Sequence, residues 1–212
     1  MKRAAARCAV LLAALSAASC ASKPPDIAPI LDIAARDCPT AASLAVATPV
    51  AATQAGDSLK PVMATIDERA PCLAGDDGKS LYALFRLPDG GPFTISLASL
   101  TLGRSLFAPR ADMLDDQGAE IRQLPQSSFM FRGTDLTVLF RSHAGERYLL
   151  VRSDVQSAGK PLSRVSGSVQ QTVVPIGYGA VSVYTGSETS TDTTWSLNGE
   201  VRVSVVADKP GS

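Results

Sequence analysis

From about residue 58 onward, apolar and polar residues alternate over short stretches of the chain, with the period of two that is typical of β-strands with one buried face. The clearest stretches surround Ile95, Val138 and Val203, where apolar side chains recur at every second position. Further segments of strand character are residues 80–87, 110–114, 121–124, 128–132, 147–153, 164–169, 180–185 and 193–197. The pattern therefore predicts a domain made almost entirely of strands.

Short runs of Gly, Asp, Asn and Pro separate these segments and favour tight turns. Asn198-Gly199 is typical of a two-residue type I′ turn, and it predicts a hairpin between residues 193–197 and 200–206. Many short strands, regular turns and the lack of a helical stretch favour an antiparallel arrangement. We therefore expect an all-β domain over residues 58–208, an antiparallel β-sandwich of jelly-roll-like or immunoglobulin-like type.

The first 20 residues follow a different pattern. Three basic residues come first, a short apolar run follows, and small residues lead directly to Cys20. This order is that of an export signal, and the apolar run is too short for a membrane-spanning helix. A cysteine in this place resembles the signal of bacterial lipoproteins, which predicts a signal peptide over residues 1–19 and lipidation, including palmitate, at Cys20. An ordinary secretory signal cut after Ala21 is the alternative.

The residues after Cys20 predict where the protein resides. Ala21 follows the cysteine where an Asp would be needed for retention, a feature that resembles Gram-negative lipoproteins sorted to the outer membrane. Several acyl chains, at about 0.8 kcal/mol per buried methylene, would hold the chain on the membrane. Residues 20–57 are rich in Ala, Pro, Ser and Thr, which predicts a flexible tether, and residues 209–212 are expected to be a disordered tail. We expect a periplasmic domain anchored to the periplasmic face of the outer membrane.

The sequence predicts a role for each of the four cysteines. Cys8 would leave with the signal peptide and Cys20 would carry lipid, so Cys38 and Cys72 remain as a pair in an oxidising compartment. They are expected to form a disulfide that contributes roughly 3–4 kcal/mol by the chain-entropy model. Two buried free thiols are the alternative.

Charge excludes one class of partner. The chain has 20 basic and 20 acidic residues, and loss of residues 1–19 would leave 17 basic residues against 20 acidic ones. Nucleic-acid binding would need a clustered basic face, so no nucleic-acid partner is expected. No apolar run after the signal is long enough for a membrane-spanning helix.

Four phrases in the second half of the chain resemble a known family. They are Arg104–Asp115 with its Phe107-Ala108-Pro109 core, Gln126–Phe131, Glu146–Asp154 and Thr193–Val205. Together they are similar to the maltose-operon periplasmic protein family, over roughly residues 80–206. The resemblance implies an exported, mostly β domain linked to maltose or maltodextrin uptake, and it supplies no catalytic motif.

The sequence contains residues found in catalytic, metal-binding and phosphate-binding sites, but each lacks the other residues that such a site requires. His143 is the single histidine and lies on a polar turn, so neither a catalytic triad nor a zinc site can be assembled around it. Residues 75–80 lack the first glycine of a phosphate-binding loop. The aspartates at 112, 115 and 116 do not have the spacing of a calcium loop. We expect no catalytic residue, no metal and no cofactor.

The best candidates for ligand binding are Trp195, Tyr184 and Asp192, because aromatic rings pack on sugar faces and neighbouring polar groups hydrogen-bond hydroxyls. An oligosaccharide is therefore one candidate ligand. The predicted function is that of a non-enzymatic cell-envelope lipoprotein, an accessory binding or interaction module linked to carbohydrate uptake. The alternative is a structural or assembly lipoprotein that pairs with an envelope protein through an edge strand.

Overall fold

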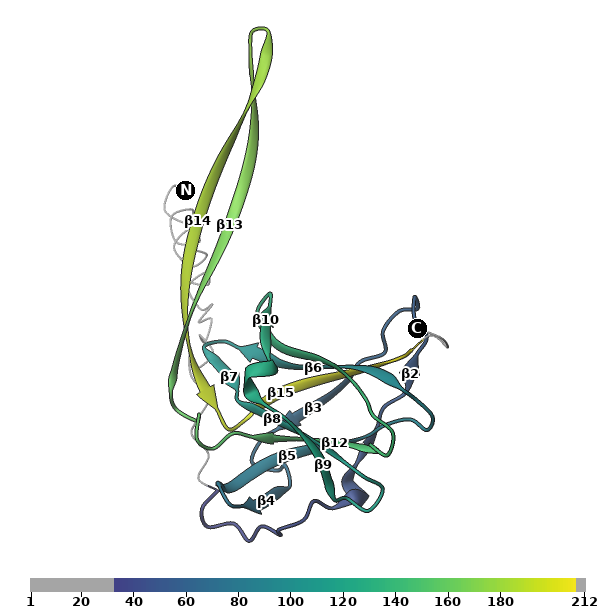
Figure 1. The fold of residues 1–212 in the computed structure, drawn as a ribbon. Helices are drawn as coiled ribbons and strands as arrows, with labels where there is room; N and C mark the ends of the chain where they lie inside the picture. The colour runs from purple at the N-terminus through teal and green to yellow at the C-terminus, as the bar shows by residue number, and fades with distance from the viewer. Residues whose placement is uncertain (1–32, 209–212) are drawn as a thin grey trace, which may run out of the picture.

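Two β-sheets pack face to face in the computed structural model, which describes residues 33–208 (Figure 1). Most neighbouring strands are antiparallel, so the all-β sandwich that the alternating pattern predicts is confirmed. The predicted signal peptide over residues 1–19, Cys20, the start of the predicted tether and residues 209–212 lie outside the described residues.

The first sheet has three long strands at its centre. β5 (Gly78–Arg86) pairs with β12 (Tyr148–Ser153), which pairs in turn with β8 (Pro109–Leu114). The remaining strands are β1 (Thr48–Pro49), β4 (Cys72–Gly75) and β9 (Glu120–Leu124).

The second sheet is built around β6 (Phe93–Leu102) and β15 (Gly199–Ala207). On one side of β6, β11 (Asp135–Arg141) and then β10 (Met130–Arg132) follow, whereas β2 (Ala52–Thr53) and β3 (Val62–Ile66) pair with β15. Beyond β6 it continues through β7 (Ser105–Phe107) into two long strands, β14 (Gly179–Ser196) and β13 (Pro161–Ile176). Among the described residues the helical elements are two short 3-10 turns, Leu44–Val46 and Gln126–Ser128. Between residues 33 and 208, no helix has the length and apolar character to cross a membrane.

The alternating residues meet between the two sheets and form the core. In the first sheet Leu149 lies opposite Phe85 on one side and Met113 on the other, and all three are fully buried. From the second sheet Ile95 pairs with Val205. Other buried residues that the pattern assigned to inner faces are Leu97, Leu136, Val138, Val201 and Val203. Burial of each such side chain contributes about 1.5–3 kcal/mol, so this layer specifies the fold.

Residues 33–57 pack against the sandwich, although their composition predicted a flexible tether. Val50 and Thr53 are buried, β1 pairs in parallel with β5, and β2 pairs in parallel with β15. The backbone N–H of Val50 also donates to the carbonyl oxygen of Arg86 at 3.0 Å. The prediction was wrong for these residues because backbone pairing at a sheet edge does not require large apolar side chains.

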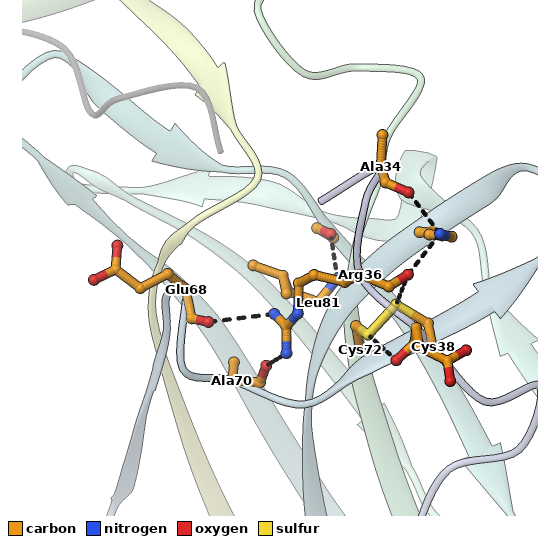
Figure 2. The surroundings of a disulfide bond; sticks show 10 residues. Ala34, Arg36, Cys38, Glu68, Ala70, Cys72 and Leu81 are labelled. Atoms are coloured by element: carbon orange, nitrogen blue, oxygen red, sulfur yellow. Dashed lines mark hydrogen bonds between the residues drawn. A yellow bond between two sulfur atoms is a disulfide. The ribbon is translucent and has the colours of Figure 1, made fainter. Parts of the chain in front are cut away.

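A disulfide between Cys38 and Cys72 ties this N-terminal segment to β4 and confirms the predicted pairing. Figure 2 shows further contacts beside it. Arg36 donates from its guanidinium to two backbone carbonyls of the loop before β4, at 3.0 and 3.3 Å. Lys79, at the start of β5, donates to the carbonyl oxygen of Arg36 at 2.6 Å. The segment is therefore held by polar contacts as well as by the disulfide.

The hairpin predicted at Asn198-Gly199 is wrong. β14, which precedes this dipeptide, pairs with β13 and β7, whereas β15, which follows it, pairs with β2, β3 and β6. Neither residue has the positive φ that a type I′ turn requires. A Cβ at Gly199 would lie 2.7 Å from the Cβ of Phe107, so close packing against Phe107 is what requires the glycine here.

Candidate functional site

The two longest strands among residues 33–208 form an arm that leaves the sandwich (Figure 1). We define the arm as residues 161–196. β13 pairs with β14 along its whole length, from Pro161 opposite Thr194 to Ile176 opposite Gly179. Sixteen residues of strand at about 3.4 Å each give the arm a length of about 50 Å.

A two-residue turn joins the strands of the arm. Gly177 has a φ of +46°, and Tyr178 has no positive φ, which is the arrangement of a type II′ turn with glycine in the first central position. The sequence predicted separate short strands at 164–169, 180–185 and 193–197. In the structure 164–169 is extended to Ile176 within β13, and 180–185 and 193–197 merge into β14. The Ser and Thr residues between the latter two fit an extended chain, and Gly186 pairs with Val169 instead of forming a turn.

The base of the arm is fixed to the sandwich. The side chains of Trp195 and Leu162 are partly buried and pack against the main core. The last residues of β14 pair in parallel with β7, and the N–H of Trp195 donates to the carbonyl oxygen of Lys160 at 3.0 Å. The guanidinium of Arg164 lies 4.8 Å from the ring centre of Phe131 on the second sheet. The arm therefore leaves the body in a defined direction.

Beyond this base the arm is exposed. All described side chains from Val169 to Glu188 lie in the exposed class, and Tyr178 at the turn is fully solvent-accessible. The sequence has no charged residue from 165 to 187. The large exposed apolar side chains on it are Val169, Val173, Val174, Ile176, Tyr178, Val181, Val183 and Tyr184. Exposed apolar side chains are thus concentrated in an uncharged extension.

The end of the arm is apolar on both of its faces, and we call residues 173–184 the apolar tip. The register places Val174 directly opposite Val181, with Ile176 and Val183 on the same face. Val173, Tyr184 and the pair Pro175–Ala180 lie on the other face. A strand pair that covers a core has one polar face, so the tip does not have the pattern of a sheet that packs on its own domain.

The three residues predicted to bind a ligand do not converge. Trp195 lies at the base of the arm, whereas Tyr184 lies 11 positions further along β14, about 37 Å away at strand spacing. The carboxylate of Asp192 accepts a hydrogen bond from the hydroxyl of Ser163 at 2.6 Å. No single concave site is formed by the three, which removes the geometric basis for assigning them one sugar.

His143 lines a cavity of about 470 Å³ between the loop before β6 and the loop before β12. The neighbouring carboxylate of Glu146 is fully buried and accepts hydrogen bonds from Arg122 at 2.8 and 2.9 Å. It also accepts one from the backbone N–H of His143, at 2.8 Å. Glu146 is therefore occupied by contacts that hold the loop, and His143 itself is mostly exposed.

Asp112 forms a buried ion pair across the first sheet. Its Oδ2 accepts from the Nε of Arg152 at 2.7 Å, and the Asp112 side chain is fully buried while that of Arg152 is 14% exposed. The second carboxylate oxygen, Oδ1, is buried without a hydrogen-bond partner. A second cavity of about 470 Å³, which also borders Thr40 and Glu120, lies beside this pair. Sequence patterning gave no signal for this pair, because neither residue occurs in a recognisable motif.

The other acidic candidates have structural roles. The Oδ1 of Asp115 accepts hydrogen bonds from two backbone N–H groups of its own turn, at 2.8 and 2.9 Å. Residues 75–80 comprise the end of β4, a two-residue turn at positions 76 and 77, and the start of β5. Asp77 in that turn bonds to Arg110, whose hydrogen bond, and then whose charge, lowers the pKa of the carboxyl. Within residues 33–208, no group of three or more His, Cys, Asp or Glu side chains could hold a metal ion.

Comparison with known proteins finds no match: no family model, no curated protein and no solved structure is similar to this chain. Membership of the maltose-operon periplasmic protein family stays a prediction from the sequence. The arm is the candidate functional site, on its geometry alone.

Proposed function

We propose that the protein is a non-enzymatic structural or assembly protein of the cell envelope, and that it acts by docking through its arm. The observation that carries this proposal is the exposed, uncharged extension with an apolar tip. Large exposed apolar surfaces mark sites of interaction in soluble domains. The arm is the element of the described chain that fits this function best.

The arm does not serve the stability of the sandwich. None of the described side chains of the arm between Gly167 and Glu188 belongs to the buried apolar core. A two-stranded ribbon is at most marginally stable in water, and ordering it costs conformational entropy. An extension that costs free energy and exposes apolar side chains is best explained by a partner that covers it.

Two features support a place in the envelope. The N-terminal pattern is that of an export signal followed by a lipidated cysteine, and the Cys38–Cys72 disulfide is typical of an oxidising compartment such as the periplasm. We propose attachment through Cys20 to the periplasmic face of the outer membrane. With no convergent polar site around Trp195, the structural function is favoured over carbohydrate binding, and the link to maltodextrin uptake rests on the family resemblance.

The anchor is tested by mass spectrometry of the protein purified from membranes. We expect a mature chain that begins at a triacylated Cys20, because the signal ends directly before it. A Cys20→Ser chain should lack the lipid mass and leave the membrane fraction. An unmodified N-terminus at Ser22 would show that the protein is simply secreted.

The docking function is tested by removing the arm. Arg164 and Thr191 lie opposite each other, so an Asn-Gly turn between them can replace residues 165–190 and preserve the base. We expect the shortened protein to keep its melting temperature within about 3 °C, because no core residue is lost. It should no longer sediment with high-mass material from envelope extracts.

Point substitutions provide a matched comparison. Serine at the tip positions Val174, Ile176, Val181 and Val183 removes one apolar face without shortening the arm. The control places serine at four similarly exposed apolar positions of the body, Val46, Leu59, Met63 and Leu139. Only the tip variant should lose the high-mass association. Unchanged sedimentation of both the shortened protein and the tip variant would contradict the proposed function.

A further inference from the structure

We infer that the arm docks onto the arms of further copies of this chain, with β13 of one copy pairing with β14 of the next. The inference rests on the proposed function and names its partner. The arms would stand side by side, with their tips at the same end, as a sheet continuous from copy to copy.

The outer edges of the arm are the first reason to infer pairing with another copy. Above Arg164 and Thr191, β13 and β14 pair with each other and with no third strand of residues 33–208. Proteins protect free edges with charged residues, especially Lys, with prolines or with bulges. Residues 165–187 contain no charge, Pro175 is their single proline, and the pairing of β13 with β14 runs without a register shift. Edges of this kind accept a further strand.

The charges of the two strands indicate which edges meet. β13 carries one charged residue, the basic Arg164, whereas β14 carries two, the acidic Glu188 and Asp192. Pairing of β13 with β13 would bring like basic charges together, and pairing of β14 with β14 would bring like acidic charges together. Pairing of β13 with β14 of the next copy places opposite charges at the same height near the base, which favours this combination.

The distribution of apolar side chains sets the direction. The apolar tip is at one end and the Ser- and Thr-rich part is at the other, so arms pointing the same way bring tip to tip. In that arrangement β13 of one copy and β14 of its neighbour run antiparallel, as within the arm itself. Such contacts are head-to-tail, and a closed ring of copies leaves no free edge.

The size of the arm also fits a second copy. Above Arg164 and Thr191 each strand offers twelve positions to the contact, residues 165–176 of β13 on one copy and residues 179–190 of β14 on the next. Because the two strands have the same length in this region, each residue of β13 has a partner residue on β14 of the next copy. Insertion of a single arm into a bilayer is the less favourable alternative, because both open edges would carry unpaired backbone groups into hydrocarbon.

The test is photocrosslinking of the full-length protein in intact cells, with benzoylphenylalanine replacing Tyr184 on β14. Tyr184 is 65% exposed, and an aromatic replacement preserves its size. The probe of each copy crosslinks to the neighbour on one side, and the probe of the neighbour on the other side crosslinks to that copy. We therefore expect a ladder of products at two, three and more times the chain mass. The control probe at Leu59, 56% exposed in the loop between β2 and β3, should give no ladder.

An edge substitution adds a second measurement. Thr172→Lys adds a charge to β13, and it should lower the yield of the ladder roughly tenfold. Thr172→Ser is the matched control and should leave the ladder unchanged. Products confined to twice the chain mass, a product with a different protein, or a lipid adduct would each overturn the inference while docking by the arm still stands. No product at all with Tyr184 replaced would overturn both.

Discussion

Replacing Arg152 with methionine will lower the free energy of unfolding by about 3–5 kcal/mol, because the change leaves the buried carboxylate of Asp112 without its counter-charge. The Oδ2 of Asp112 would lose its 2.7 Å bond from Arg152, and Oδ1 already lacks a partner. Methionine keeps much of the volume of the arginine stem, so the loss reports mainly on the charge. Urea unfolding of both proteins, followed by Trp195 fluorescence, measures the difference.

A double variant separates the pair from its surroundings. Replacing a buried ion pair with apolar residues of similar volume is often neutral or stabilising. The chain with both Arg152→Met and Asp112→Leu should therefore recover most of the stability that the single variant loses. A loss below about 1 kcal/mol in Arg152→Met alone would mean that water in the adjoining cavity solvates Asp112 and that the pair contributes little.

Removing the Cys38–Cys72 disulfide has the second large expected effect. The two cysteines are 34 positions apart, and closing a loop of this length contributes about 4 kcal/mol in the chain-entropy model. Because a domain of this size shifts by about 2–4 °C per kcal/mol, the protein with both cysteines replaced by alanine should melt about 8–16 °C lower. Thermal unfolding by circular dichroism measures the shift.

Reduced wild-type protein is the matched control for this variant. It should melt at about the same temperature as the alanine variant, because both lack the cross-link and differ only at two sulfur atoms. A shift below about 2 °C would show that the contacts of Arg36 and Lys79 hold the segment without the disulfide. The reduced protein separates this outcome from a packing defect caused by the alanines.

The strands of the sandwich could be predicted from the sequence because each has one face in a core. Alternation identified the buried positions at Ile95, Leu97 and Val203, and the structure buries all three. Two cysteines remain once Cys8 is assigned to the signal peptide and Cys20 to the lipid, and this even number predicted the Cys38–Cys72 bond. The alternation is a local signal and the disulfide follows from the number of cysteines. Neither requires knowing which strands are neighbours in the sheets.

The rest depended on contacts between distant segments. Asn198-Gly199 carries a strong local turn signal, but Phe107 packs against Gly199 and the flanking strands pair elsewhere. The arm could not be predicted as one element, because alternation detects strands that cover a core and the arm covers none. Its available signals were the long uncharged stretch from 165 to 187 and the Gly177-Tyr178 turn.

The position of β15 has a consequence for how the protein is made. β15 is the last strand described, yet it lies inside the second sheet and pairs with β3 and β6, more than 90 residues earlier in the chain. That sheet can be completed only after residue 207 has emerged, and such long-range pairing slows folding. The second sheet would therefore stay incomplete until synthesis is nearly finished, which would suit the export that the N-terminal pattern predicts.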